Sequence, residues 1–283
     1  FVPLAEGGGM EIKMIKRMRY YFSVGATFVR LSIQCGLEYP MNLLGWILVN
    51  PIQFILGFAT IKFVIEQFGN LGGWGYESLS FLYGLAVLSH GLAVILFIQT
   101  WHMGSRIIRG EFDRFLLRPM SVLFQFLFMD FNLVGVSDLI PGFIIFIYGC
   151  IKVEFNCRVD NFLWVILTVV GGVLIRGSVW MICGSLAFFK RSTTNFIGFT
   201  LELFDRVTMY PLSIYPKGIQ CFFTFILPLA WITFYPTMDI LDLYPMAIPV
   251  NMATITLGIG LLMFVLSCSF FYIGMKRYES TGS

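Results

Sequence analysis

Long apolar windows constrain the fold of this chain more than any other feature. A helix that crosses a lipid bilayer needs about 20 mostly apolar residues. Five such windows are residues 43–65, 79–101, 133–153, 161–189 and 252–275, and a shorter one, residues 219–235, follows a proline-rich stretch. Of the residues, 58% are hydrophobic and 12% are charged, about half the charged share of a soluble domain. We therefore predict an all-α polytopic membrane protein with six transmembrane helices.

The chain reads as a single transmembrane domain, residues 10–283, because no repeat or low-complexity linker divides it. The leading FVPLAEGGG, residues 1–9, is interpreted as a cloning remnant or fusion scar.

Basic residues predict the orientation, since cytoplasmic segments of membrane proteins are rich in Lys and Arg. With both termini in the cytoplasm, the inner segments hold 15 of the 19 basic residues. These are Lys13, Lys16, Arg17, Arg19, Arg30, Arg106, Arg109, Arg114, Arg118, Lys190, Arg191, Arg206, Lys217, Lys276 and Arg277. The outer loops then hold Lys62, Lys152 and Arg158. We predict cytoplasmic termini.

The fifth crossing has two possible positions. Residues 219–235 can cross, or residues 194–212 can cross despite their charges, with residues 217–236 entering and leaving the outer side as a re-entrant hairpin. Prolines suit a broken element because they lack the helical N–H donor. Either way, residues 210–250 form an extracellular or re-entrant segment before the last span. The prolines of this outer hairpin are Pro211, Pro216, Pro228 and Pro236.

Motifs of nucleotide, metal and hydrolytic sites are missing from the sequence. There is no GxxxxGK[ST] phosphate loop and no G-x-S-x-G elbow. His90 and His102 are read as lying on or near the ends of the second span, without Glu or Cys at ligand spacing, so no metal site is expected. The six cysteines form no CxxC pair, and a net charge of +3 is too small to indicate nucleic acid. We expect no catalytic residue and no cofactor in this chain.

The segment between the second and third windows, residues 102–132, concentrates charge in RIIRGEFDRFLLRP, residues 106–119. GEFDRFLLRP alternates acidic, aromatic, basic and aliphatic residues, as a short amphipathic helix would, and Pro119 would end that helix. A plain cytoplasmic loop would explain the arginines but not the apolar residues among them, which indicate a docking surface. We expect Phe112 and Phe115 to be its apolar anchors, with Glu111, Asp113 and Arg114 at its rim.

Several segments resemble ABC-2-type permeases, the membrane half of ATP-binding-cassette exporters, in the subfamily of small six-span bacterial permeases. They are Gly110–Asp113 with Leu116–Pro119 and Gln125, Tyr210–Pro216, Leu227–Ala230, Tyr235–Pro236 and Arg277–Ser280. Their order and spacing carry the resemblance, which covers nearly the whole chain from Met10.

The resemblance implies that residues 102–132 are a coupling loop, whose coupling helix docks on a cytosolic ATPase. The implied docking residues are Arg109, Gly110, Glu111, Phe112, Asp113, Arg114, Phe115, Leu116 and Arg118. Residues 10–42 would be an interfacial connecting helix, and this agrees with the alternation of basic and apolar residues in EIKMIKRMRYYF.

The family also implies the assembly. ATP and Mg²⁺ would be bound by partner ATPase subunits, and a second permease, identical or homologous, would pair with this one. The complex would sit in a bacterial cytoplasmic membrane and export a hydrophobic or amphipathic substrate such as a drug, antibiotic, peptide or lipid-like molecule.

Four ionisable residues lie at or near membrane depth, Asp138, Arg176, Glu202 and Asp205. Such residues either line a transport path or pair with one another, for instance Arg176 with Glu202 or Asp205. If they relay ions, the chain would be an ion-coupled secondary transporter, although such carriers usually show inverted repeats, which are not visible in this sequence. A membrane scaffold without an ATPase partner is the third alternative.

Overall fold

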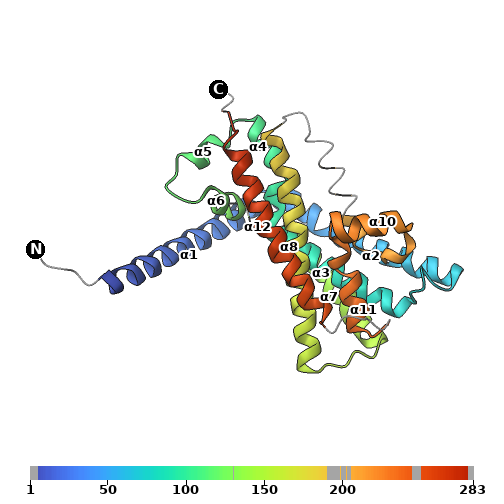
Figure 1. The fold of residues 1–283 in the computed structure, drawn as a ribbon. Coiled ribbons are helices and arrows are strands. Elements are labelled where there is room, and N and C mark those ends of the chain that lie inside the picture. The colour runs from blue at the N-terminus through green and yellow to red at the C-terminus, as the bar shows by residue number, and fades with distance from the viewer. Residues whose placement is uncertain are drawn as a thin grey trace, which may run out of the picture.

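The computed structural model describes residues 6–129, 131–189, 198, 202, 205–243 and 250–279, and of residues 6–15 and 17 it describes the backbone only. Within these ranges the regular elements are all helices, with no strand and one isolated bridge between Leu71 and Trp74 (Figure 1). Five helices are long and apolar enough to cross a membrane. They are α2 (Pro40–Phe68), α3 (Tyr76–Trp101), α7 (Leu133–Lys152), α8 (Val159–Ser185) and α12 (Met252–Met275). The five long windows of the sequence are thus confirmed as helices.

A further long helix, α1 (Glu6–Glu38), precedes these five. Short α-helices lie between them, namely α4 (Met103–Ile108), α5 (Asp113–Leu116), α6 (Val122–Phe128), α10 (Lys217–Cys221) and α11 (Phe234–Ile240). Three 3₁₀ turns (Leu186–Phe188, Leu212–Ile214 and Leu229–Trp231) and one π-helical turn (Phe222–Ile226) complete the described elements.

Glycines let α3 and α7 pack with their backbones in contact. An added Cβ at Gly84 would lie 2.5 Å from the backbone nitrogen of Phe146, and one at Gly135 would lie 2.8 Å from the carbonyl oxygen of Gly91. The glycines of α7 recur every seventh residue, at Gly135, Gly142 and Gly149. Small residues at such an interface are the common solution in membranes, where lipid offers no hydrophobic drive for helix association.

Two ends of the bundle can be defined from these helices. The loop end is where α3, α8 and α12 finish, and it carries α4 and α5 (Figure 1). The α11 end is where the same three helices begin, and there Leu241 and Asp242 border a polar hollow with Glu77 of α3 and Lys152 of α7. The helices α2 and α7 run from the loop end to the α11 end, antiparallel to the other three.

The described residues 198, 202 and 205–213 include one contact at each end of the bundle. A Cβ on Gly198 would lie 3.7 Å from the indole nitrogen of Trp101, at the loop end. The Ser213 hydroxyl donates a hydrogen bond of 2.7 Å to the carbonyl of Gly72, in the α2–α3 connection at the α11 end. This supports the second interpretation of the sequence, in which residues 194–212 cross. Residues 190–197 lie outside the described residues, and with them Lys190 and Arg191.

The next segment is a broken hairpin. Lys217–Ile226 and Leu229–Ile240 meet at an angle of 80°, with Pro228 at the break. The hairpin reaches the middle of the bundle, since a Cβ on Gly172 of α8 would lie 3.1 Å from the side chain of Ile232. Because the hairpin leaves from and returns to the α11 end, Lys217 begins at that end. Arg206 falls within the crossing. The sequence prediction that Lys217 and Arg206 belong to the inner segments is therefore wrong for these two residues.

Each proline of the hairpin stands where a helical turn begins, a position at which the missing N–H removes no helical bond. Pro211, Pro216 and Pro228 directly precede turns, and Pro236 lies in the first turn of α11.

Helix α1 extends away from the bundle (Figure 1). It begins at Glu6, inside the segment read as a fusion scar, and the next helix starts at Pro40 rather than after residue 42. One stripe of α1 packs against α6: the ring of Tyr21 lies 4.8 Å from that of Phe124, and Ser32 donates to the Met129 carbonyl. Most of its other side chains are exposed, including Phe22 and Arg19. All six cysteines are free.

Candidate functional site

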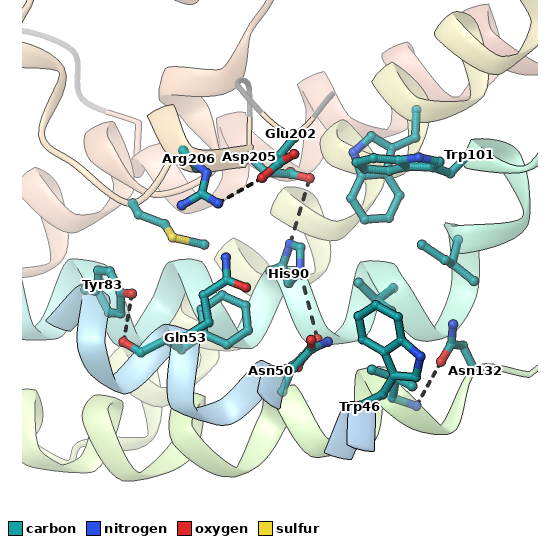
Figure 2. A pocket seen from close by; sticks show the side chains of 18 of the residues that line it. Trp46, Asn50, Gln53, Tyr83, His90, Trp101, Asn132, Glu202, Asp205 and Arg206 are labelled. Atoms are coloured by element: carbon teal, nitrogen blue, oxygen red, sulfur yellow. Dashed lines mark hydrogen bonds and ion pairs between the residues drawn. The ribbon is translucent and has the colours of Figure 1, made fainter. Parts of the chain in front are cut away.

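A cavity of about 570 Å³ opens between α2, α3, α7 and residues 202–210. This size lies in the range of roughly 300–1,000 Å³ that holds small organic ligands. Figure 2 shows Trp46 and Trp101 at one end of the cavity, Gln53 and Tyr83 at the other, and His90 between them. The lining also includes Asn50, Phe54, Asp138, Trp180, Glu202, Asp205 and Arg206. Aromatic and ionisable groups therefore share one space at membrane depth.

A buried ion pair lies at one wall of the cavity, where Asp205 belongs to the lining. Arg176 of α8 is 1% exposed, and its guanidinium donates to the Asp205 carboxylate and, at 2.8 Å, to the hydroxyl of Thr208. The Thr208 hydroxyl in turn donates to the Asp205 carbonyl at 2.7 Å. The two partners come from elements far apart in the chain, so the pair fixes the fifth crossing against α8. Of the two partners that the sequence suggested for Arg176, the structure therefore shows Asp205.

Glu202, the other predicted partner, pairs instead with Arg206 at 2.8 Å, one helical turn away. Both side chains are more than half exposed, 59% and 54%. Because such exposed pairs contribute little to stability, this pair does not fix the fifth crossing as the pair of Arg176 and Asp205 does.

His90 connects the charged groups, a role that the sequence did not reveal. Its Nδ1 lies 3.4 Å from a guanidinium nitrogen of Arg176 and 4.0 Å from the Asp205 carboxylate, and its Nε2 lies 3.9 Å from Asp138. The expectation that His90 lies near the end of a span is wrong, because α3 runs from Tyr76 to Trp101 and places it in the middle. The sequence feature that could have indicated this role is that His90 is a single histidine inside an apolar window.

Asp138 faces the cavity from α7 and is 1% exposed. Within the described part of the chain, neither of its carboxylate oxygens has a hydrogen-bond partner of normal geometry, although the side chain of Asn50 interacts with it. Gly91 lets the helices approach here, since an added Cβ would lie 3.3 Å from that of Asp138. Pro141 has no N–H, so the carbonyl of Ser137 beside Asp138 lacks its helical donor. This turn of α7 is therefore rich in unsatisfied acceptors.

The predicted docking stretch lies at the loop end, as a helix and a single turn. Helix α4 ends at Ile108, and Gly110, two residues later, has a positive φ of 70° that lets the N–H of Glu111 bond to the Arg106 carbonyl at 3.0 Å. The Glu111 carboxylate then folds back onto Arg109 at 2.8 Å and Arg106 at 3.8 Å. Asp113 begins the single turn of α5, which ends before Pro119.

The two expected anchors, Phe112 and Phe115, are not exposed, and this expectation is wrong. Their exposed fractions are 0% and 5%. The ring of Phe112 lies 5.0 Å from that of Phe188, after α8, and 5.1 Å from that of Tyr278, after α12. The chain's own aromatic cluster covers both side chains, because burying them against α8 and α12 removes more apolar surface from water than a loop could.

Other residues of the stretch are exposed. Leu117 is 84% and Leu116 47% exposed, and Arg109, Arg114 and Arg118 of the same stretch are exposed as well. Gln125 holds the stretch in place, since its side-chain amide donates to the carbonyls of Phe115 and Met120, both at 3.2 Å. The surface therefore keeps its basic rim, while its exposed apolar part is aliphatic.

A family model described as ABC-2 family transporter protein matches residues 48–282. The chain belongs to the ABC-2 transporter family. The match covers most of α2, every later long helix, the cavity lining except Trp46, and the stretch of residues 106–119. No curated protein matches the chain.

Membership makes this chain an ABC-2-type permease, the multi-pass membrane subunit of an ABC transporter. In such a transporter the permease carries the transport path and is not itself catalytic, and the family implies an ATPase partner. The match supports neither the ion-coupled secondary carrier nor the scaffold.

Proposed function

We propose that this permease exports a hydrophobic or amphipathic molecule across a bacterial cytoplasmic membrane. Separate ATPase subunits at the loop end would bind ATP and Mg²⁺ and drive it. The observation that carries this proposal is the cavity of about 570 Å³ at membrane depth, with aromatic walls and ionisable groups in one lining. Apolar walls favour a ligand that partitions into lipid, and the polar groups orient it.

The loop end supports docking of an ATPase. Its exposed part combines Leu116 and Leu117 with three arginines, and its buried part is one block with α8 and α12. An exposed aliphatic patch with charges at its edge is typical of a protein interface. Phe112 and Phe115 shape this surface from beneath instead of contacting the ATPase.

A movement at the loop end has a continuous route to the cavity. Helix α4 follows α3 after a break at His102, and Arg106 bonds to the Gln99 side chain across that break at 2.9 Å. His90 lies further along the same helix and contacts Arg176 and Asp205. Closure of the ATPases would therefore tilt α3 and α8 together and open the cavity to alternate sides, a rigid-body transition.

We infer the orientation from charge: the loop end faces the cytoplasm, and the hairpin of Lys217–Ile240 covers the path on the outer side. A second permease, identical or homologous, completes the assembly. Helices α2 and α12 offer the apolar outer faces for lipid or for that partner, with Leu48, Phe63 and Val265 all more than half exposed.

The test is to purify the tagged permease with its ATPase and measure ATP-driven uptake of rhodamine 6G, an amphipathic dye, into inverted vesicles. We expect uptake that requires ATP hydrolysis and falls when Trp46→Ala and Trp101→Ala together remove the aromatic end of the cavity. Wild-type uptake by that double variant would refute the cavity as the path. Failure of any ATPase to copurify would refute the coupling.

A further inference from the structure

Among the described residues, one carboxylate of the cavity has no arginine partner. Of the two guanidinium groups beside the cavity, Arg176 is paired with Asp205 and Arg206 with Glu202. Asp138 is the remaining carboxylate, and the basic side chain within 4 Å of it is His90. The other histidine of the lining, His102, follows the last residue of α3. In the described part of the chain Asp138 therefore lacks a permanent counter-charge.

His90 does not supply that charge. A guanidinium can only donate hydrogen bonds, so the Nδ1 that faces Arg176 at 3.4 Å is the accepting nitrogen of a neutral ring. The ring proton then sits on Nε2 and points toward Asp138 across 3.9 Å, beyond hydrogen-bonding distance. A protonated His90 ring would be repelled by the positive charge of Arg176.

The burial of Asp138 makes this unusual. Charged side chains inside a membrane pair with one another or mark a functional site. Asp138 is 1% exposed and lines the cavity, and among the described residues its oxygens have no hydrogen-bond partner of normal geometry, the Asn50 side chain being the polar group that interacts with it. Its oxygens are therefore placed to accept from a molecule inside the cavity.

Aromatic rings extend from this point. The His90 ring lies 5.4 Å from Phe54 on one side and 6.0 Å from Trp180 on the other, and Trp180 lies 5.8 Å from Trp101. Aromatic faces attract cations and hold apolar groups beside them. A carboxylate beside a row of rings fits an organic cation better than a metal ion, which needs several oxygen or nitrogen ligands.

We propose that Asp138 is the cation-binding group of the cavity and that the transported molecule joins an apolar or aromatic body to a single amine. This inference rests on the export function proposed above and adds the charge of the substrate. The ammonium group donates to the Asp138 carboxylate, and the body lies along Phe54, Trp180 and Trp101. An anionic molecule finds no free guanidinium there, because Arg176 and Arg206 are both paired.

The test compares two probes that differ in one charge. Dansylcadaverine carries a primary ammonium group, and its N-acetyl derivative has the same dansyl body without the charge. Binding to the purified transporter in nanodiscs is followed by dansyl fluorescence. We expect the wild type to bind dansylcadaverine about tenfold or more tightly than the acetylated probe, as expected when a charge-assisted hydrogen bond is lost.

Three variants test whether Asp138 causes the preference for the charged probe. Asp138→Asn keeps the shape of the side chain and should bind both probes equally, while Asp138→Glu should keep part of the preference. Glu202→Gln removes a carboxylate that lines the same cavity but is paired with Arg206, so its preference should equal that of the wild type. Equal elution volumes and melting temperatures of Asp138→Asn and the wild type show that the variant is folded.

Several results would overturn the proposal. The first is equal binding of the two probes by the wild type, and the second is no binding of dansylcadaverine at all. The third is a preference for dansylcadaverine that remains in Asp138→Asn. The last result would mean that Asp138 is a neutral carboxyl in the folded protein. The export function is tested separately by ATP-driven uptake into inverted vesicles. Charge-selective binding without any uptake would refute export and leave the cation site standing.

Discussion

The ion pair between Arg176 and Asp205 provides the sharpest test of the packing at the cavity. Arg176 is 1% exposed, so Asp205→Asn would leave a guanidinium buried without its counter-charge. Breaking a buried pair from one side costs about 3–5 kcal/mol. The bond to Thr208 would remain, but a hydroxyl supplies no compensating charge.

The double variant Arg176→Met with Asp205→Asn should be far more stable than Asp205→Asn alone. Methionine fills a similar volume, and replacing both members of a buried pair is often close to neutral. The two changes should therefore be strongly non-additive, with a coupling free energy at the upper end of the roughly 0.5–3 kcal/mol seen for contacting residues. Thr208 keeps a partner in the double variant, because its hydroxyl donates to the backbone carbonyl of residue 205.

The assay is the apparent melting temperature of the purified permease in one detergent, followed by tryptophan fluorescence. A change of 1 kcal/mol shifts the melting temperature of a chain of similar size by about 2–4 °C. Asp205→Asn should therefore lower it on the order of 10 °C.

Glu202→Gln is the matched control. Its pair with Arg206 is more than half exposed and is worth about 0–1 kcal/mol, so the melting temperature should hardly change. An unchanged melting temperature for Asp205→Asn would refute the reasoning. So would a double variant that is less stable than Asp205→Asn.

Three further predictions concern the rest of the fold. Leu117→Asp should reduce copurification of the ATPase and leave the melting temperature of the permease unchanged. Phe115→Ala should lower the melting temperature, since truncating a buried Phe costs about 3–5 kcal/mol. If Phe115→Ala instead released the ATPase at an unchanged melting temperature, Phe115 would be the docking anchor after all. Gly84→Ala should destabilise the permease by about 1–3 kcal/mol, because its Cβ would meet the backbone of α7 at 2.5 Å. Gly258→Ala is the control, since an added Cβ there has nothing within 4 Å and should not change the stability. Thermal unfolding of both variants measures the difference. A single cysteine at Asp242 in a cysteine-free background should react with an impermeant maleimide from outside whole cells, and labelling only after lysis would reverse the inferred orientation.

The spans were predictable from the sequence because they depend on composition over a window. A run of about 20 apolar residues must leave water whatever surrounds it, so the five long helices follow from the sequence alone. The broken hairpin was also signalled, since Pro228 cannot continue a helix that begins at Lys217. The sequence left open where the fifth crossing lies, because the charges of residues 194–212 are tolerated only when partners on other helices meet them.

Residue partners depended on the tertiary structure. The pattern of residues 106–119 separated apolar from charged side chains correctly, but it could not say what covers the apolar ones. Phe112 is covered by rings that follow α8 and α12, more than 70 residues away in the chain, and Phe115 packs against Phe112 and Phe126. Local periodicity reports that a face avoids water and carries no information about whether an ATPase or the chain itself covers it.

The same limit applies to the charges of the cavity. The sequence determined that Arg176, Asp205 and Asp138 lie at membrane depth, since each stands within or beside an apolar window. Only the packing of α3, α7 and α8 decided that Arg176 meets Asp205, that His90 lies between them, and that Asp138 is left without a counter-charge. Electrostatic pairing acts over a few ångströms in space, and the sequence orders residues only along the chain.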